Sequence, residues 1–226
     1  MGRGLPGART FRVRPDVRQD AGRGPEEAEV GSVSVNLAKG QSVSLLKSTG
    51  ETLSVVRMGL GWKSAPGKRG FFSRRPKEID LDASALLYDG KVMSDVVFFS
   101  HLVSNEGSVR HTGDNLVGGA GAGGDDESIM VDLTKVPRRV TQIVFTVSSY
   151  TGQNFMEVQN AHCRLVDETT GKELARYELT GGGPHTGQIM AKVERDGEGG
   201  WKMTAIGAPA SGRTFRDMLP FIEPFL

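Results

Sequence analysis

The chain has 226 residues, and its 28 Lys and Arg against 27 Asp and Glu give a net charge of +1 at pH 7. This balance gives no reason to expect binding to nucleic acid or to an acidic membrane by charge alone. No apolar run approaches the ~20 residues of a transmembrane helix, and the first residues lack the apolar core of a signal peptide. A cytoplasmic protein is therefore expected, and the single Cys163, which cannot form an internal disulfide, agrees with a reducing compartment.

Residues 1–30 are rich in Arg, Gly and Pro and contain few core-forming residues, which predicts a disordered extension. One domain is expected to follow, over residues 31–226. The Arg-rich start and a basic loop at 63–77, which carries Phe71 and Phe72, leave nucleic-acid contact as an alternative. Such aromatic side chains more often fold back onto their own domain. Nucleic acid is therefore not the expected partner.

The remaining sequence consists of short β-rich runs separated by turns that contain glycine, as is typical of β-strands. The predicted strands are 33–37, 42–46, 52–60, 78–87, 95–103, 108–111, 128–133, 140–150, 161–166, 173–179, 188–194 and 201–206. Residues 153–160 are either a short helix or an irregular crossover, and 213–222 has the apolar spacing of a short terminal helix. The predicted fold class is all-β, a β-sandwich of two packed sheets with short peripheral helices.

Two carboxylates share one face of the predicted strand 78–87. Ile79 and Leu81 alternate with Asp80 and Asp82, and residues two apart on a strand point the same way at a separation of ~6.6 Å. Carboxylates so placed repel each other. They are therefore either solvated on an outer face or held together by a cation.

A second group of oxygen donors flanks a glycine-rich loop between residues 112 and 127. The donors are Asp114 and Asn115 before the glycines, and Asp125, Asp126 and Glu127 after them. Glycine tolerates backbone angles that let such a loop fold back on itself, so its carbonyl groups can turn inward while the carboxylates converge. The resulting cage of oxygen atoms suits Ca²⁺ better than Mg²⁺. The alternative is a flexible, solvated acidic loop.

Two better-known loop patterns do not fit this segment. Leu116 and Gly118 stand where an EF-hand would place alternate ligands after Asp114. A GxGxxG match within the loop is followed directly by acids, which would repel the pyrophosphate of a dinucleotide. Any calcium site here is therefore of another type.

No catalytic set emerges from the sequence. Cys163 and His162 are neighbours in a predicted strand and so point to opposite faces, which prevents them from acting together as nucleophile and base; a core thiol is the simpler interpretation. A metal-dependent phosphoester hydrolase stays open as the enzyme alternative, with the acids holding Mg²⁺ or Mn²⁺. No recognisable motif is present to assist the leaving group.

Several strings resemble, in order and with similar spacing, the TerD family of tellurium-resistance and stress proteins. They are VSVNLAKGQSVSL (33–45), GLGW (59–62), DLDAS (80–84), HTGDNL (111–116), GDDE (124–127), QNF (153–155) and WKMTAIG (201–207). The family consists of calcium-binding β-sandwiches. The resemblance implies that one or two calcium ions are lined by Asp80, Asp82, Asp114, Asn115, Asp125, Asp126 and Glu127.

The resemblance also implies a non-catalytic bacterial role in resistance to tellurite and other chemical stresses. The protein would act as an ion-ordered interaction module with other stress-response proteins or a membrane-associated complex. Its expected location is the cytoplasm, or the membrane periphery through that complex.

Two departures from the family pattern predict weaker calcium binding. Lys63 follows Trp62, where the family usually has Asp. The glycine loop carries no acids between residues 116 and 124 and is about two residues longer than usual. Because ligand charge tunes calcium affinity, one retained site or two weakened sites are expected.

Overall fold

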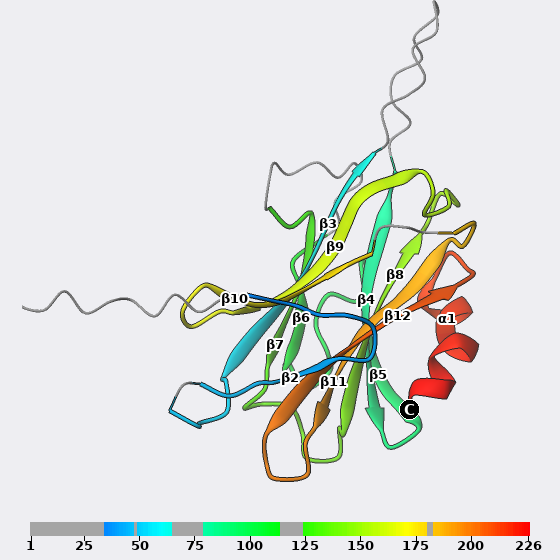
Figure 1. The fold of residues 1–226 in the computed structure, drawn as a ribbon. Helices are drawn as coiled ribbons and strands as arrows, with labels where there is room; N and C mark the ends of the chain where they lie inside the picture. Colours follow the sequence, from blue (N-terminus) through cyan, green and yellow to red (C-terminus); the bar gives the residue numbers. More distant parts are fainter. Residues whose placement is uncertain (1–33, 48, 65–78, 114–123, 180–182) are drawn as a thin grey trace, which may run out of the picture. The chain divides into compact units, whose positions relative to one another are not determined.

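A computed structural model describes residues 34–47, 49–64, 79–113, 124–179 and 183–226 (Figure 1). The predicted disordered extension at 1–30 and most of the basic loop at 63–77 lie outside these residues. The described residues form one compact unit. In the described part, no helix is long and apolar enough to cross a membrane.

The described strands form two six-stranded sheets. Sheet A has the order β1 (Val35–Asn36), β10 (Lys172–Glu178), β9 (Val158–Asp167), β3 (Val55–Ser64), β7 (Glu127–Asp132) and β6 (Val109–His111). Sheet B has the order β2 (Ser42–Ser44), β12 (Trp201–Ala210), β11 (Gly187–Arg195), β8 (Gln142–Ser149), β4 (Leu81–Asp89) and β5 (Val92–Val97). The predicted all-β sandwich is confirmed.

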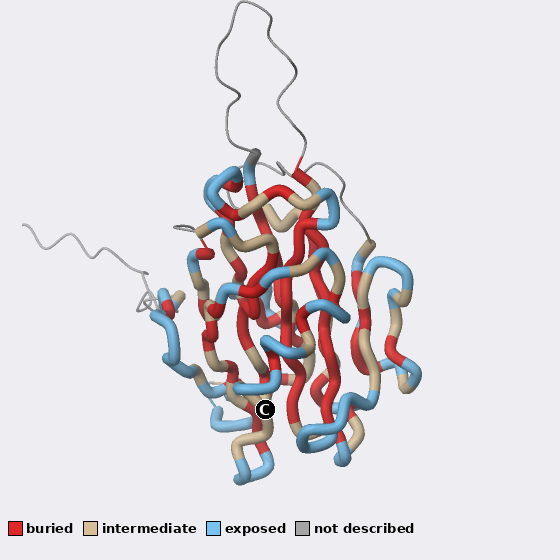
Figure 2. Tube along the Cα trace, turned by 90° about the vertical axis from the view of Figure 1, so that its right-hand side faces the viewer, coloured by how far each residue is buried: buried red, intermediate tan, exposed pale blue. Residues whose placement is uncertain are grey.

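The main core lies between the two sheets, where the buried segments gather in Figure 2. Every second side chain of a strand points into this core. On β3 these are Met58, Leu60 and Trp62, and on β4 they include Leu81 and Ala83. Removing these side chains from water drives the two sheets together. The alternation predicted around Ile79 and Leu81 is confirmed.

A second apolar cluster covers the outer face of sheet B. The C-terminal helix α1 (Phe215–Ile222) buries Phe215, Met218 and Ile222 against that face, a spacing that places all three on one side of a helix. At its N-terminus, the carboxylate of Asp217 accepts a hydrogen bond from the main-chain nitrogen of Thr214 at 3.0 Å, which satisfies one donor that the helix leaves unpaired. A short 3₁₀ helix, η1 (Glu223–Phe225), follows. The predicted terminal helix is therefore confirmed.

Three predicted segments differ from the structure. The apolar run 95–103 is a strand only to Val97, because Phe98 and His101 then pair across a tight turn. Residues 153–160 contain no helix: residues 153–157 are irregular, as the crossover alternative predicted, but β9 already begins at Val158. Strand β3 continues past Trp62, since Lys63 and Ser64 pair with β9. In each case the bounds of the strand are set by backbone pairing, which the pattern of apolar residues in the sequence does not contain.

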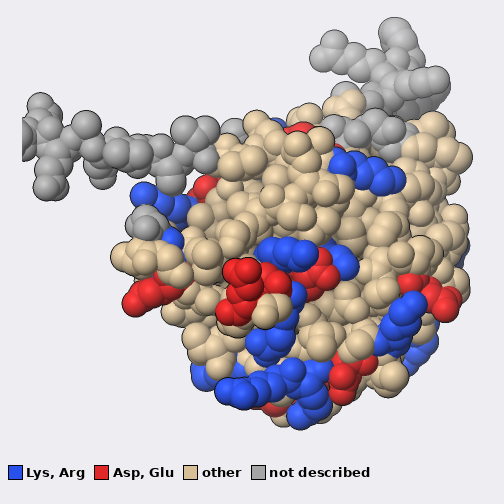
Figure 3. Space-filling view, turned by 60° about the horizontal axis from the view of Figure 1, so that its bottom comes forward, with Lys and Arg blue, Asp and Glu red and all other residues tan. Residues whose placement is uncertain are grey.

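The surface carries no single-sign field on the face shown in Figure 3, where basic and acidic side chains lie interspersed. This agrees with the near-zero net charge. Such a face does not resemble the continuous basic stripe by which proteins follow a nucleic-acid backbone.

Candidate functional site

Trp62 joins the two acidic stretches of the chain. Its main-chain nitrogen donates a hydrogen bond to Oδ2 of Asp126 at 2.8 Å, and its indole nitrogen donates to the carbonyl oxygen of Ile79 at 2.9 Å. Because Trp62 is almost completely buried in the main core, both hydrogen bonds are held in a fixed position. The stretch that carries Asp80 and Asp82 therefore lies beside the start of β7.

Glu127 makes a second link between the same stretches. Its Oε2 accepts a hydrogen bond from the main-chain nitrogen of Ala83 at 2.8 Å, so the side chain reaches from sheet A to β4 of sheet B. The Glu127 carboxylate is 0% exposed. An ionised carboxylate in such a place needs compensating positive charge or hydrogen bonds.

His111 lies next to this carboxylate, with its Nε2 3.4 Å from Oε2 of Glu127 and its side chain equally buried. The main-chain nitrogen of Gly113 donates to Nδ1 of His111 at 3.1 Å. Nδ1 of His111 thus accepts a main-chain hydrogen bond, which orients Nε2 toward Glu127. Sequence reasoning did not single out His111 for this role.

Asp82 lies on the face of β4 that points away from the main core, and Asp80 directly precedes that strand. Asp82 is only 6% exposed and Asp80 is partly buried. Oδ1 of Asp80 and Oδ2 of Asp82 are both inaccessible to water. A solvated outer face, one of the two interpretations of this pair, is therefore wrong for Asp82.

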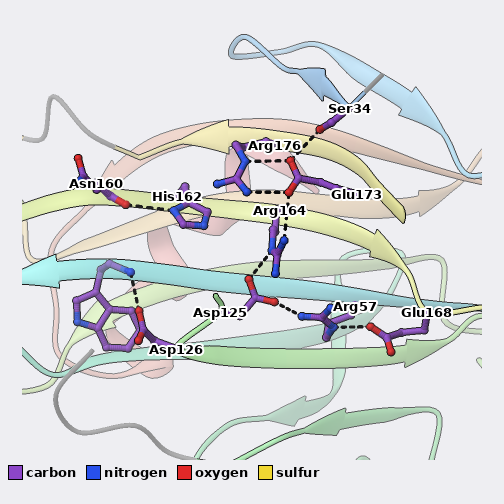
Figure 4. Close-up of polar contacts among 11 residues, drawn as sticks. Ser34, Arg57, Asp125, Asp126, Asn160, His162, Arg164, Glu168, Glu173 and Arg176 are labelled. Atoms are coloured by element: carbon purple, nitrogen blue, oxygen red, sulfur yellow. Dashed lines mark hydrogen bonds and ion pairs between the residues drawn. The ribbon is translucent and has the colours of Figure 1, made fainter. Parts of the chain in front are cut away.

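Asp125 lies elsewhere, on the outer face of sheet A, between two arginines (Figure 4). Nε of Arg164 donates to Oδ1 of Asp125 at 2.6 Å, and Nη1 of Arg57 donates to Oδ2. The carboxylate lies over Gly59, where a Cβ atom would approach Cγ of Asp125 to 2.2 Å. The Asp125 side chain is 4% exposed. It fastens the end of the glycine loop to β3 and β9.

The ion pairs extend from Asp125 across sheet A. Arg57 also pairs with Glu168, and Arg164 pairs with Glu173, which accepts further hydrogen bonds from Arg176 and Ser34. Burial alone would raise the pKa of Glu173, but the hydrogen bonds from Arg176, Ser34 and Arg164 outweigh it and lower that pKa to about 2. Sequence reasoning missed this network, because its members are polar residues on strands far apart in the chain.

The low pKa of Glu173 predicts a contribution to acid stability. Its folded pKa of about 2 lies below the unfolded value of ~4.3, so its stabilisation is present above that unfolded value and disappears as pH falls toward 2. In Glu173→Gln, urea unfolding should show a smaller loss of stability between neutral pH and pH ~3. We expect a difference of about 1 kcal/mol down to pH ~3, since only part of the titration is complete at that pH and solvent screens part of the interaction. Equal acid sensitivity in both proteins would contradict this assignment.

The predicted site residues thus fall into three groups. Those near Trp62 are Asp80, Asp82, Asp126 and Glu127. Asp125 lies on the outer face of sheet A, and Asp114 and Asn115 lie outside the described residues. Within the described ranges, no three His, Cys, Asp or Glu side chains converge closely enough to hold a metal ion. The described carboxylates can therefore supply only part of a coordination shell.

Cys163 points into the main core and is completely buried. Burial raises the pKa of its thiol to about 12, which keeps the sulfur protonated at neutral pH and so poorly nucleophilic. The prediction of a core thiol is confirmed.

Residues 33–219 match the TerD domain. The chain belongs to the TerD family. It is 46% identical over 189 residues to the tellurium resistance protein TerZ of Serratia marcescens, a match that covers 81% of this chain and 94% of TerZ. It is 36% identical to the stress response protein SCP2 of Bacillus subtilis (strain 168), covering 83% of this chain and 98% of SCP2. The family resemblance inferred from the sequence is confirmed.

Solved structures show the same fold at lower sequence identity. A protein of unknown function, SAV2460, superimposes with a TM-score of 0.59 at 20% identity, over 73% of this chain and 94% of that structure. A TerD homologue from Streptomyces coelicolor A3(2), SCO6318, gives a TM-score of 0.53 at 18% identity, over 72% of this chain and 92% of that structure. The sandwich of this TerD-family protein is therefore shared with experimentally determined structures.

Proposed function

We propose that this TerD-family protein is a calcium-binding, non-catalytic bacterial stress-response protein of the tellurite or chemical-stress resistance type. The bound ion orders the loop between β6 and β7 and shapes a surface for other stress-response proteins or a membrane-associated complex. The names of the relatives TerZ and SCP2 support the stress-response class. We place the protein in the cytoplasm, or at the membrane periphery through that complex.

The observation that carries the calcium proposal is the burial of carboxylate oxygens beside Trp62. Asp82 and Glu127 are both almost inaccessible to water, and Glu127 binds the main chain next to Asp82. Crowded, desolvated negative charge is costly, and a divalent cation offsets that cost. Ca²⁺ fits because carboxylate, amide and carbonyl oxygens are the ligands it prefers.

We assign the ligands to the acids near Trp62 and to the first end of the glycine loop. The proposed ligands are Asp80, Asp82, Asp126 and Glu127, of which the described structure brings no three together, so Asp114, Asn115 and main-chain carbonyl groups of the loop would complete the shell. Asp125 has its two oxygens engaged by guanidinium groups, so we assign it the role of an anchor that holds the loop end in place. Lys63 is exposed. One site or two weakened sites stay the expectation for this chain.

Calcium titration of the full chain by calorimetry, with thermal melts in parallel, tests the proposal. Binding should be saturable and should stabilise the fold by about 2.7 kcal/mol at a hundredfold excess over the dissociation constant. Mg²⁺ should bind more weakly. The double variant Asp80→Asn/Asp82→Asn should lose most of the calcium response, whereas Asp89→Asn, at an exposed position on the same strand, should keep it.

Two results would overturn the proposal. One is the absence of heat and of any melting shift at millimolar calcium. The other is turnover of a phosphoester with Mn²⁺ or Mg²⁺ that disappears in the Asp80→Asn/Asp82→Asn variant. The second result would establish the hydrolase alternative, in which the acids hold a metal that activates water.

A further inference from the structure

A cavity of about 580 Å³ opens between β10 of sheet A and β11 and β12 of sheet B, and none of the acidic residues near Trp62 is among its described lining residues. The inner face of β12 fills the core with Trp201, Met203 and Ala205 but then continues with Gly207 and Pro209 at the cavity. The ring of Tyr177 crosses from β10, and a Cβ atom at Gly207 would approach its hydroxyl oxygen to 1.8 Å. Gly207 thus gives room to the Tyr177 ring, and both residues line the cavity.

Gln188 lines this cavity from β11. Its side chain is only 6% exposed, and its Oε1 is buried without a hydrogen-bond partner among the described residues. An amide oxygen in that position loses its water contacts and gains nothing in return, a cost that folded proteins usually avoid. A bound molecule that donates a hydrogen bond would remove the cost.

His185 presents a second group of the same kind. Its Nε2 is buried and, within the described part of the chain, has no hydrogen-bond partner. The ring is held in place by stacking on Phe155, with centroids 5.1 Å apart. Burial lowers the pKa of His185, so at neutral pH the ring is uncharged and one of its nitrogens accepts a hydrogen bond.

The charge of the lining restricts what can bind. No Lys or Arg lies among the described lining residues, and Glu178 contributes a carboxylate. An anion would therefore enter without a cationic partner and beside a negative charge, which is unfavourable in a partly desolvated cavity. A phosphate or carboxylate ligand does not suit this cavity.

The hydrogen-bonding groups suit hydroxyl groups instead. Tyr177, Gln188, His185 and Ser211 can each donate and accept a hydrogen bond, as a sugar hydroxyl does. The rings of Pro184, Pro209 and Tyr177 supply apolar surface for carbon-bound hydrogens. A volume of about 580 Å³ also lies within the usual range of small-molecule sites, ~300–1,000 Å³.

We propose that this cavity, lined by Tyr177, His185, Gln188 and Ser211, binds a neutral polyhydroxyl molecule of mono- to disaccharide size. The Gln188 amide and the His185 ring orient the ligand through its hydroxyl groups. This site is independent of the calcium proposal, because it shares none of the proposed ion ligands.

Nuclear magnetic resonance titration of the full chain with D-glucose, N-acetylglucosamine, maltose and myo-inositol tests the proposal. At least one of these probes should shift the side-chain amide of Gln188 and the main-chain amide of Gly207 in a saturable way. Glucose 6-phosphate should bind more weakly than glucose, because the phosphate meets no cationic group. Equal or tighter binding of the phosphate, or no shift with any probe at millimolar concentration, would overturn the proposal.

Two variants separate ligand binding from structural effects. Gln188→Leu removes the unpaired buried oxygen, so we expect an unchanged or higher Tm together with loss of the sugar response. Ser211→Trp closes the mouth of the cavity from an exposed position and should also abolish the response. The control Lys91→Gln, exposed at the distant end of β4 and β5, should leave the response intact. A response that survives Gln188→Leu, or a fall in Tm for that variant, contradicts the assignment.

Discussion

Replacing Asp125 with Ala should lower the free energy of unfolding by about 3 kcal/mol, the scale seen when one partner of a buried ion pair is removed. The substitution would leave Arg57 and Arg164 close to each other on sheet A without the carboxylate that lies between them. It would also release the loop end from β3 and β9. Urea unfolding of the purified variant at neutral pH measures the loss.

Gly59 provides an independent check on the same contact. A methyl group in Gly59→Ala would collide with the Asp125 carboxylate, so that variant should be destabilised through the same ion pairs. The double variant should therefore cost clearly less than the sum of the two single changes, because both act on one interaction. Asp89→Ala, at an exposed carboxylate, should stay within about 0.5 kcal/mol of wild type.

A further variant, Asp125→Asn, tests whether Asp125 binds the ion. If Asp125 is an anchor, Asp125→Asn should be less stable but should still show a calcium response once folded. A variant with wild-type stability and no calcium binding would make Asp125 a ligand, as the family resemblance implies, and would contradict the anchor role.

Glu127→Gln should have the largest effect on calcium. The Gln side chain keeps an oxygen that can accept the hydrogen bond from Ala83, but it removes a buried negative charge from the proposed site. We expect calcium affinity to fall by on the order of a hundredfold, since even outer-shell changes at metal sites cost about 10- to 100-fold. Calorimetry with wild type and variant in the same buffer measures the change.

Stability without calcium should respond differently to Glu127→Gln. Because the buried carboxylate carries a desolvation cost, its neutral isostere should leave the calcium-free protein as stable as wild type or more stable. The control Glu157→Gln changes an exposed carboxylate and should alter neither property. Strong destabilisation of the calcium-free Glu127→Gln protein, with calcium affinity intact, would show that Glu127 serves only the fold through Ala83 and His111.

Patterns in the sequence were enough to predict the fold class, the family and the faces of individual strands. Alternation places Leu81 on the core side and Asp80 and Asp82 on the other, because side chains on a strand point to opposite faces in turn. The apolar spacing of Phe215, Met218 and Ile222 is enough to predict a terminal helix with one buried face. Such features follow from residues close together in the chain.

Which polar groups contact each other follows from the three-dimensional fold. Asp125 and Arg57 are 68 positions apart, and Glu127 and Ala83 are 44 apart, so their contacts depend on strand order, register and the approach of the two sheets. The same holds for the cavity at Gln188, which forms where Gly207 on a neighbouring strand lies opposite Tyr177 from the other sheet. Side-chain periodicity fixes the direction in which a residue points, whereas its partner is fixed by non-local pairing that no local pattern contains.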